Sequence, residues 1–229
     1  MASQPHFSPE LFEFLRELEA NNNRRWFEAN RARYRQVVQE PLLAFIADFS
    51  EPLRRISRHF VADPRPQGGS MFRVHRDVRF SADKRPYKTM AAAQFRHRQG
   101  QDVHAPGFYL HLEPGSVFAG GGLWHPDPAT LAKVRNAIVE SPDRWRSATS
   151  DPTFTRRHTL DGDSLRRPPR GFDPDHPLIE DIQRKDFVTL VAFPDRSVCR
   201  GGFLDEFAAV CREAVPFMRF LTEAVGLEF

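Results

Sequence analysis

The N-terminal quarter of the chain spaces its apolar residues with the period of an α-helix. Apolar side chains recur three or four residues apart along residues 8–18, 26–38 and 43–56, which places them on one face of a helix. Pro9 suits the first turn of the first helix, whereas Pro41 is expected to interrupt the second. The sequence therefore predicts three N-terminal helices, and their short connections favour antiparallel packing.

Beyond a loop at residues 62–70 the period changes to two. Apolar and polar residues alternate over residues 72–80 and again over residues 108–112, as in strands with one buried face. The four apolar side chains of the first of these strands are predicted to face the helices. A further strand is predicted near residues 117–119, and the turn sequence at residues 113–116 makes it a hairpin with the strand before it.

The remaining elements complete a mixed pattern. Residues 187–193 are apolar on both faces, which is typical of a central strand. Residues 127–140 and 203–221 predict helices, the second kinked by Pro216. We find no internal repeat and no linker. The sequence predicts one α+β domain over residues 1–229, in which an antiparallel or mixed β-sheet packs against N-terminal and C-terminal helices.

Composition excludes several classes of protein. Charged residues at 28% beside 40% hydrophobic residues indicate a soluble globular protein, and no apolar run approaches the ~18–20 residues of a membrane span. No secretion signal is recognisable, and Cys199 and Cys211 are the only cysteines, so we expect a cytoplasmic protein. No metalloprotease, Walker, nucleophile-elbow or CxxC motif is present, so neither a metal nor a cofactor is expected.

Cations are concentrated in residues 73–88, although the formal net charge of the chain is only +3. The stretch holds Arg73, Arg76, Arg79, Lys84, Arg85 and Lys88. Lysine accounts for only four of the 33 Lys and Arg residues, and two of those four lie here. Arginine is a planar fork and lysine a compact point charge, a combination that suits phosphate or carboxylate. The stretch therefore predicts a site for an anion.

Ten residues make up the candidate ligand-binding set. They are Arg73, His75, Arg76, Asp77, Arg79, Lys84, Tyr87, Lys88, Tyr109 and His111. Asp77 is flanked by cations, which lower the pKa of a carboxyl and leave it a poor base near neutral pH. Arg76 has the parity of the apolar face, where a buried guanidinium requires a carboxylate or several carbonyls. We favour an ion pair that anchors the sheet to a helix, while a bulge at Arg76 and Asp77 would turn Arg76 toward the polar side. Tyr109 and His111 belong to the set if their strand neighbours the charged one.

The charged stretch also resembles a known motif. From Arg73 to Lys88 it fits R-x-x-R-D-x-R-F-x-x-x-K-x-P-Y-K at every fixed position, and residues 22–27, NNRRWF, are similar to an early NN-x-x-WF segment that accompanies this motif. Both segments look like those of the bacterial family known as domain of unknown function 2461. The resemblance runs along most of the chain, but it implies no activity, because the family is named for the lack of one.

Three functions are left open by the sequence. The first is a binding or enzymatic site for a small molecule that carries a phosphate or carboxylate. The second is a nucleic-acid binder with Trp26, Tyr87 and Tyr109 as stacking platforms, although the small net charge lends it little support. The third is a protein-interaction domain in which the charged stretch is a structural ion-pair network. A concave cationic pocket, a basic groove and internally paired charges distinguish the three, and the oligomeric state is left open.

Overall fold

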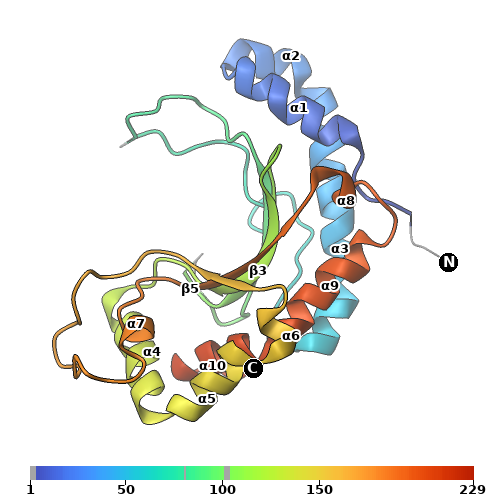
Figure 1. Cartoon of the computed structure of the whole chain (residues 1–229). Helices are drawn as coiled ribbons and strands as arrows, with labels where there is room; N and C mark the ends of the chain where they lie inside the picture. Colours follow the sequence, from blue (N-terminus) through green and yellow to red (C-terminus); the bar gives the residue numbers. More distant parts are fainter. Residues whose placement is uncertain (1–3, 80, 101–103) are drawn as a thin grey trace.

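A computed structural model describes residues 4–79, 81–100 and 104–229 (Figure 1). The N-terminal helices are α1 (Pro9–Ala20), α2 (Arg24–Tyr34) and α3 (Glu40–Ile56), with the π-helical turn η1 (Arg35–Gln39) between α2 and α3. The later helices are α4 (Pro128–Glu140), α5 (Pro142–Ser150), α6 (Pro152–Thr155), α7 (Ile179–Ile182), α8 (Asp195–Val198), α9 (Phe203–Glu213) and α10 (Val215–Ala224). The strands are β1 (Ala91–Arg96), β2 (Gly107–Leu112), β3 (Val117–Leu123), β4 (Thr159–Asp161) and β5 (Phe187–Phe193). The chain therefore has the predicted α+β fold.

Within the described residues, the strands form one sheet in the order β1-β2-β3-β5-β4, and every neighbouring pair is antiparallel. The predicted hairpin is present: β2 and β3 pair with Leu110 opposite Ala119, and Ser116 N–H donates to Glu113 O across the turn. β5 pairs with β3 along its length but with β4 over only three residues. β5 therefore lies between β3 and β4, next to the edge rather than at the centre of the sheet, and its side chains alternate in burial.

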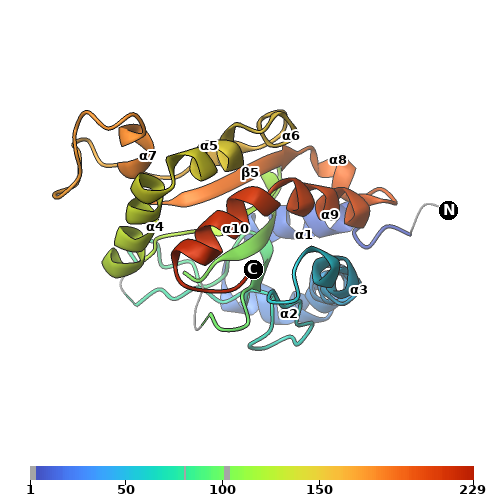
Figure 2. The ribbon, with the colours of Figure 1, turned by 90° about the horizontal axis from the view of Figure 1, so that it is seen from below.

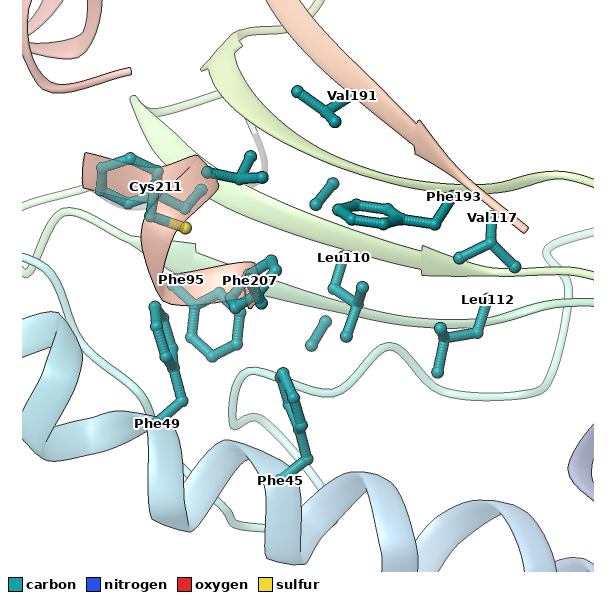
Figure 3. Packing of buried hydrophobic residues seen from close by; sticks show 14 of the residues in the cluster. Phe45, Phe49, Phe95, Leu110, Leu112, Val117, Val191, Phe193, Phe207 and Cys211 are labelled. Atoms are coloured by element: carbon teal, nitrogen blue, oxygen red, sulfur yellow. The ribbon is translucent and has the colours of Figure 1, made fainter. Parts of the chain in front are cut away.

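Helices α3, α9 and α10 cover one face of the sheet (Figures 1 and 2). The core forms where side chains of α3 and α9 meet that face (Figure 3). The Phe49 ring lies 4.7 Å from Phe95 of β1 and 4.7 Å from Phe207 of α9, both in edge-on contact. Leu110 and Leu112 point to the same side. Since side chains alternate along a strand, Tyr109 and His111 lie on the opposite face.

The prediction of a strand over residues 72–80 is wrong, although the alternation behind it is real. Side chains at even positions from 72 to 78 are half-buried and those at odd positions are exposed, but within the described residues only isolated bridges form: Met71 with Ala93 and His75 with Tyr87. Pro86 has no N–H to give, and Asp77 and Asp83 accept the backbone N–H groups of Arg79 and Arg85. Such local bonds compete with a strand ladder. Phe80 lies outside the described residues.

The strand that the sequence analysis did not foresee is β1. Its residues, AAAQFR, begin with three alanines, which carry no period-two signal and have low strand propensity. In the structure β1 pairs with β2 along its length, and Phe72 N–H donates to Ala92 O. The segment that precedes the charged stretch is thereby tied to the sheet through β1.

Two prolines act differently from their predicted roles. Pro41 does not end a helix; α2 continues through η1 into α3, with Pro41 in the first turn of α3. A widened π turn accommodates the missing N–H of the proline. Pro216 does not kink one long helix either. It lies in the first turn of α10, after α9 has ended, where no N–H is needed.

The strand predicted near residues 117–119 extends through Gly120, Gly121 and Gly122, which are part of β3. A Cβ atom on Gly120 would lie 1.8 Å from the carbonyl oxygen of Thr189 in β5, and one on Gly122 would lie 2.0 Å from that of Phe187. These glycines therefore allow the backbones of β3 and β5 to approach closely. Among the described residues, no helix is both long and apolar enough to cross a membrane.

Candidate functional site

Residues 72–79 and 81–90 form an arm that projects from the sheet on the side away from α3 and α9 (Figure 1). At its tip, Asp77 holds Arg79 through two side-chain bonds, Nε to Oδ1 at 3.0 Å and a terminal guanidinium nitrogen to Oδ2 at 2.7 Å. The side-chain bond from Arg79, followed by its backbone N–H, lowers the pKa of Asp77 to about 2. Asp77 is therefore an arginine partner and not a base at neutral pH.

A second carboxylate organises the rest of the tip. Asp83 accepts hydrogen bonds from Arg85 and from Arg76, and those from Arg85 lower the pKa of Asp83 most. Arg76 thus has the carboxylate partner that its half-buried position requires, but within the arm and not on a helix. Lys84 Nζ donates to the carbonyl oxygen of Val78 at 3.0 Å. The contacts of the tip hold its own backbone turns.

Tyr87 anchors the arm to the N-terminal helices. Its side chain is buried, and its ring stacks on Phe27 at a centroid distance of 4.1 Å and an interplanar angle of 22°. Asn22 accepts the Tyr87 N–H and donates to its carbonyl oxygen, both at 3.0 Å. The His75 ring lies 5.1 Å from that of Tyr87. These contacts place His75 and Tyr87 against α2 and not beside Tyr109 and His111.

The sheet face opposite α3 and α9 carries a chain of hydrogen bonds. Tyr109 Oη lies 3.0 Å from Nδ1 of His111, and Nε2 of His111 lies 3.1 Å from Oε2 of Glu113. Thr89 donates to the other carboxylate oxygen of Glu113 at 2.8 Å. With Glu113 ionised, Nε2–H of His111 donates and its Nδ1 accepts from the Tyr109 hydroxyl. Burial raises the pKa of Tyr109, with a smaller contribution from the charge of Glu113.

Lys88 lies at the base of the arm, next to this hydrogen-bonded chain. Its Nζ lies 4.9 Å from the centroid of the Phe72 ring, which in turn contacts the Tyr109 ring edge-on at 6.0 Å. Burial lowers the pKa of Lys88, and the charge of Arg73 adds to the effect. Among the described residues, no carboxylate forms an ion pair with Lys88 or Arg73. The base of the arm therefore presents a half-buried ammonium without an anionic partner.

A comparison with protein families shows to which family the chain belongs. The model of a family described as "Conserved hypothetical protein (DUF2461)" matches residues 10–220. The chain belongs to this family. The match confirms the membership predicted from the charged motif. It includes the whole arm and the sheet face that carries Tyr109, His111 and Glu113, which we call the polar sheet face. Comparisons with curated proteins and with solved structures gave no match.

In this DUF2461 chain the ten candidate residues separate into three groups. The tip of the arm holds Arg76, Asp77, Arg79 and Lys84; the contact with α2 holds His75 and Tyr87; the base of the arm and the polar sheet face hold Arg73, Lys88, Tyr109 and His111. The side chains of the first group are bonded to groups within the tip, and those of the second lie against α2. The third group alone combines an unpaired cation with titratable groups.

Sequence reasoning did not include Glu113 and Thr89 in the site. A signal for Glu113 was present, because Tyr109, His111 and Glu113 alternate along one strand and so share a face. Thr89 offered no such signal, since its contact with Glu113 depends on how the arm returns to the sheet. His125 and Asp186 were also missed; they form a separate pair at the other end of β3.

The polar sheet face can store a proton. If the Tyr109 hydroxyl receives a proton from a bound molecule and passes its own to Nδ1 of His111, the imidazolium that results is balanced by Glu113. Such a step requires both existing hydrogen bonds and no further group. Within the described residues, no cluster of three or more His, Cys, Asp or Glu side chains is placed to hold a metal ion.

Proposed function

We propose that this DUF2461 protein binds a small molecule bearing a phosphate or carboxylate group at the base of the arm. Lys88 and Arg73 receive the anionic group, and Tyr109 meets a neighbouring hydroxyl or N–H of the same molecule. The observation that carries the proposal is the half-buried Lys88 ammonium, which pairs with no carboxylate among the described residues.

The energetics of Lys88 support an anionic ligand. Removing an ammonium from water without a counter-ion is unfavourable, and the lowered pKa of Lys88 has this origin. The Phe72 ring compensates only in part, since a cation–π contact contributes about 0.5–2 kcal/mol. A bound anion restores a favourable environment for the charge and raises the pKa again. Binding should therefore be coupled to proton uptake by Lys88 at alkaline pH.

Proton abstraction is the reaction type that the polar sheet face supports best. Tyr109, His111 and Glu113 are already hydrogen-bonded in series, so a proton taken from the ligand reaches His111 without rearrangement. The anion-binding cation lies next to the tyrosine through Phe72. A ligand held by its phosphate or carboxylate would thus present an adjacent hydroxyl or N–H to the Tyr109 oxygen.

The small-molecule function is favoured over nucleic-acid binding by the state of the aromatic rings. Tyr87 is covered by Phe27, and Trp26 packs against Phe14 at 5.5 Å, so neither ring offers an open stacking platform. Ion pairs at the tip support a structural role for Arg76 and Arg79, and the bond from Lys84 to the carbonyl oxygen of Val78 supports one for Lys84. The anion site is therefore assigned to Lys88 and Arg73 alone.

Thermal melts across a panel of anions test the proposal. The panel is inorganic phosphate, glycerol phosphate, citrate and chloride, all at one ionic strength, with the parent, Lys88→Met and the matched control Lys84→Met. A ligand at ~100 times its Kd stabilises the folded state by about 2.7 kcal/mol, which corresponds to a Tm rise of about 5–11 °C at this chain length.

We expect phosphate or a carboxylate to raise the Tm of the parent and of Lys84→Met, but not that of Lys88→Met. Two results contradict the proposal: an anion-specific shift that survives in Lys88→Met, or no shift above that of chloride in the parent at millimolar concentrations.

A cytoplasmic location is part of the same proposal. Cys199 and Cys211 are free, and Cys211 is buried, as expected for a protein of a reducing compartment.

A further inference from the structure

His125 adopts a backbone conformation that needs an explanation. It is the one non-glycine residue with positive φ, +47°, in the part of the chain that the structure describes. It lies two residues after the end of β3, where an ordinary turn residue would serve to leave the sheet. L side chains rarely occupy this region, and residues held there concentrate at binding and catalytic sites.

Asp186 holds His125 in this conformation. One carboxylate oxygen accepts both the backbone N–H and Nδ1–H of His125, each at 2.7 Å, and the other oxygen accepts the N–H of Asp163 at 3.0 Å. The Asp186 side chain is only 2% exposed. Burial acts to raise the pKa of Asp186, but the hydrogen bonds from His125 and Asp163 outweigh it and the pKa is lowered. An ionised Asp186 fixes the proton of neutral His125 on Nδ1 and leaves Nε2 as an acceptor.

The imidazole ring is held on a second side. Trp124 stacks on it with a centroid distance of 4.2 Å and an interplanar angle of 20°. The Trp124 side chain is half exposed, and its ring is nearly parallel to that of His104 at 6.1 Å. His125 is therefore restrained at its Nδ1 edge and on one face, while 53% of its side chain is open to solvent. Among the described residues, none bonds Nε2.

A pocket of about 350 Å³ lies against this histidine. Its apolar wall is built from Pro106, Leu123, Val225 and Leu227, and its polar side from His104, His125, Asp127 and Thr130. None of the described lining residues is Lys or Arg, and the lining includes the acidic residue Asp127. The charge therefore disfavours an anion, in contrast to the arm.

We propose that this pocket is a second small-molecule site, for an uncharged ligand with a flat apolar body and one hydroxyl or N–H group. His125 Nε2 accepts the hydrogen bond of that group, while Pro106, Leu123 and Val225 contact the apolar body. Asp186 and Trp124 position the imidazole. The inference is independent of the anion site, because no residue is shared between the two.

Phenol and anisole are matched probes for this site. They have nearly the same shape, but only phenol has an O–H to donate, and benzoate adds the negative charge. Binding is followed by NMR on the parent and on two variants, His125→Asn and the control His6→Asn. Asparagine tolerates positive φ, so the first variant keeps the turn. His6 also pairs with an aspartate, Asp48, at 2.9 Å, but away from the pocket.

In the parent and in His6→Asn, we expect phenol to bind about fivefold more tightly than anisole, and benzoate to bind more weakly than both. In His125→Asn the preference for phenol should vanish. The parent alone provides a second readout: the side-chain nitrogens of His125 should report an Nδ1–H tautomer, and phenol should shift Nε2. Equal affinities of phenol and anisole in the parent, or an unshifted Nε2 at saturating phenol, overturn the proposal.

Discussion

The hydroxyl of Tyr109 lies 3.0 Å from Nδ1 of His111, on the face of the sheet opposite α3 and α9. Because Glu113 engages the other ring nitrogen of His111, the imidazole has one orientation, and with Glu113 ionised its Nδ1 accepts from the Tyr109 hydroxyl. Two side chains that are ordinary in isolation thus form a directed proton path at the base of the arm.

Tyr109→Phe should remove this path at a modest cost in stability. The variant keeps the ring contact with Phe72 and leaves Nδ1 of His111 without its donor. We expect the free energy of unfolding to fall by about 1–2 kcal/mol, with an anion-induced Tm shift close to that of the parent, since Lys88 and Arg73 remain. Urea unfolding measures the free energy, and thermal melts with and without phosphate measure the Tm shift. Loss of the phosphate shift would place the hydroxyl in direct contact with the anion.

Alkaline pH should unfold the protein before its tyrosines ionise. All three tyrosines have pKa values raised above the ordinary 10.0, each mainly by burial, which brings Tyr34 to about 12. A tyrosine whose pKa is higher in the folded state than in the unfolded state stabilises the fold at pH values below the unfolded pKa of about 10. This stabilisation is lost as the pH rises toward the folded pKa. We expect tyrosinate absorbance to appear abruptly, together with loss of far-UV circular dichroism. A gradual titration near pH 10 in folded protein would contradict this.

Mild acid should destabilise the fold through His158. Its side chain is fully buried, with Nδ1 bonded to Thr189 Oγ1 at 3.1 Å and Nε2 3.6 Å from Glu213. Burial lowers the pKa of His158, against the opposing effect of Glu213. As the pH falls through about 6.5, the unfolded chain therefore binds a proton that the folded chain does not. The free energy of unfolding should decrease by up to ~1.4 kcal/mol per pH unit in this range.

The control for this prediction is His158→Phe, which retains the stacking of the ring on Phe154 but cannot titrate. Its slope between about pH 5 and 7 should be smaller than that of the parent. Some slope should persist, because burial also lowers the pKa of His97. Identical slopes in parent and variant would contradict the prediction, since they would mean that folding does not change the proton binding of His158.

Phe27 should matter more to stability than Trp26. Phe27 is 2% exposed and contacts both Tyr34 and Tyr87, whereas Trp26 is half-buried at the margin of the core. Phe27→Ala should cost about 3–5 kcal/mol and Trp26→Ala about 1–3 kcal/mol. Chemical denaturation of both variants measures the difference. The reverse order would mean that the arm is not held through the Phe27–Tyr87 stack.

Gly120→Ala should prevent stable folding. The new Cβ would overlap the Thr189 carbonyl oxygen, a backbone atom of the β3–β5 ladder that cannot move without breaking that ladder. We expect a loss of more than ~4 kcal/mol, seen as insoluble protein or a collapsed Tm. Gly115→Ala is the control: Gly115 has a positive φ of +74° but open space around it, so its cost should be only about 1 kcal/mol.

Much of the local structure followed from the sequence alone. Helical spacing predicted α1, α2 and α3, the turn at residues 113–116 predicted the β2–β3 hairpin, and both are confirmed. The alternation of apolar and polar residues along residues 72–79 correctly predicted which side chains of the arm are exposed, even though no strand forms there. These features depend on residues close in the chain, whose spacing decides which side chains share a face.

Tertiary structure decided which charges are satisfied. Arg79 and Lys84 find partners at the tip, while Lys88, from the same motif, is half-buried without a carboxylate among the described residues. Residue type does not distinguish these outcomes. They depend on turns that bring carboxylates to some cations and on the Phe72–Tyr109 contact that shields another.

The same holds for the pair at the second pocket. His125 and Asp186 are 61 residues apart in the sequence, and the sequence around each of them does not predict their contact. β3 and β5 pair so closely, through Gly120 and Gly122, that the end of one strand meets the start of the other. Spacing along the chain determines the face on which a side chain lies, but only the packing of distant segments determines what it meets there.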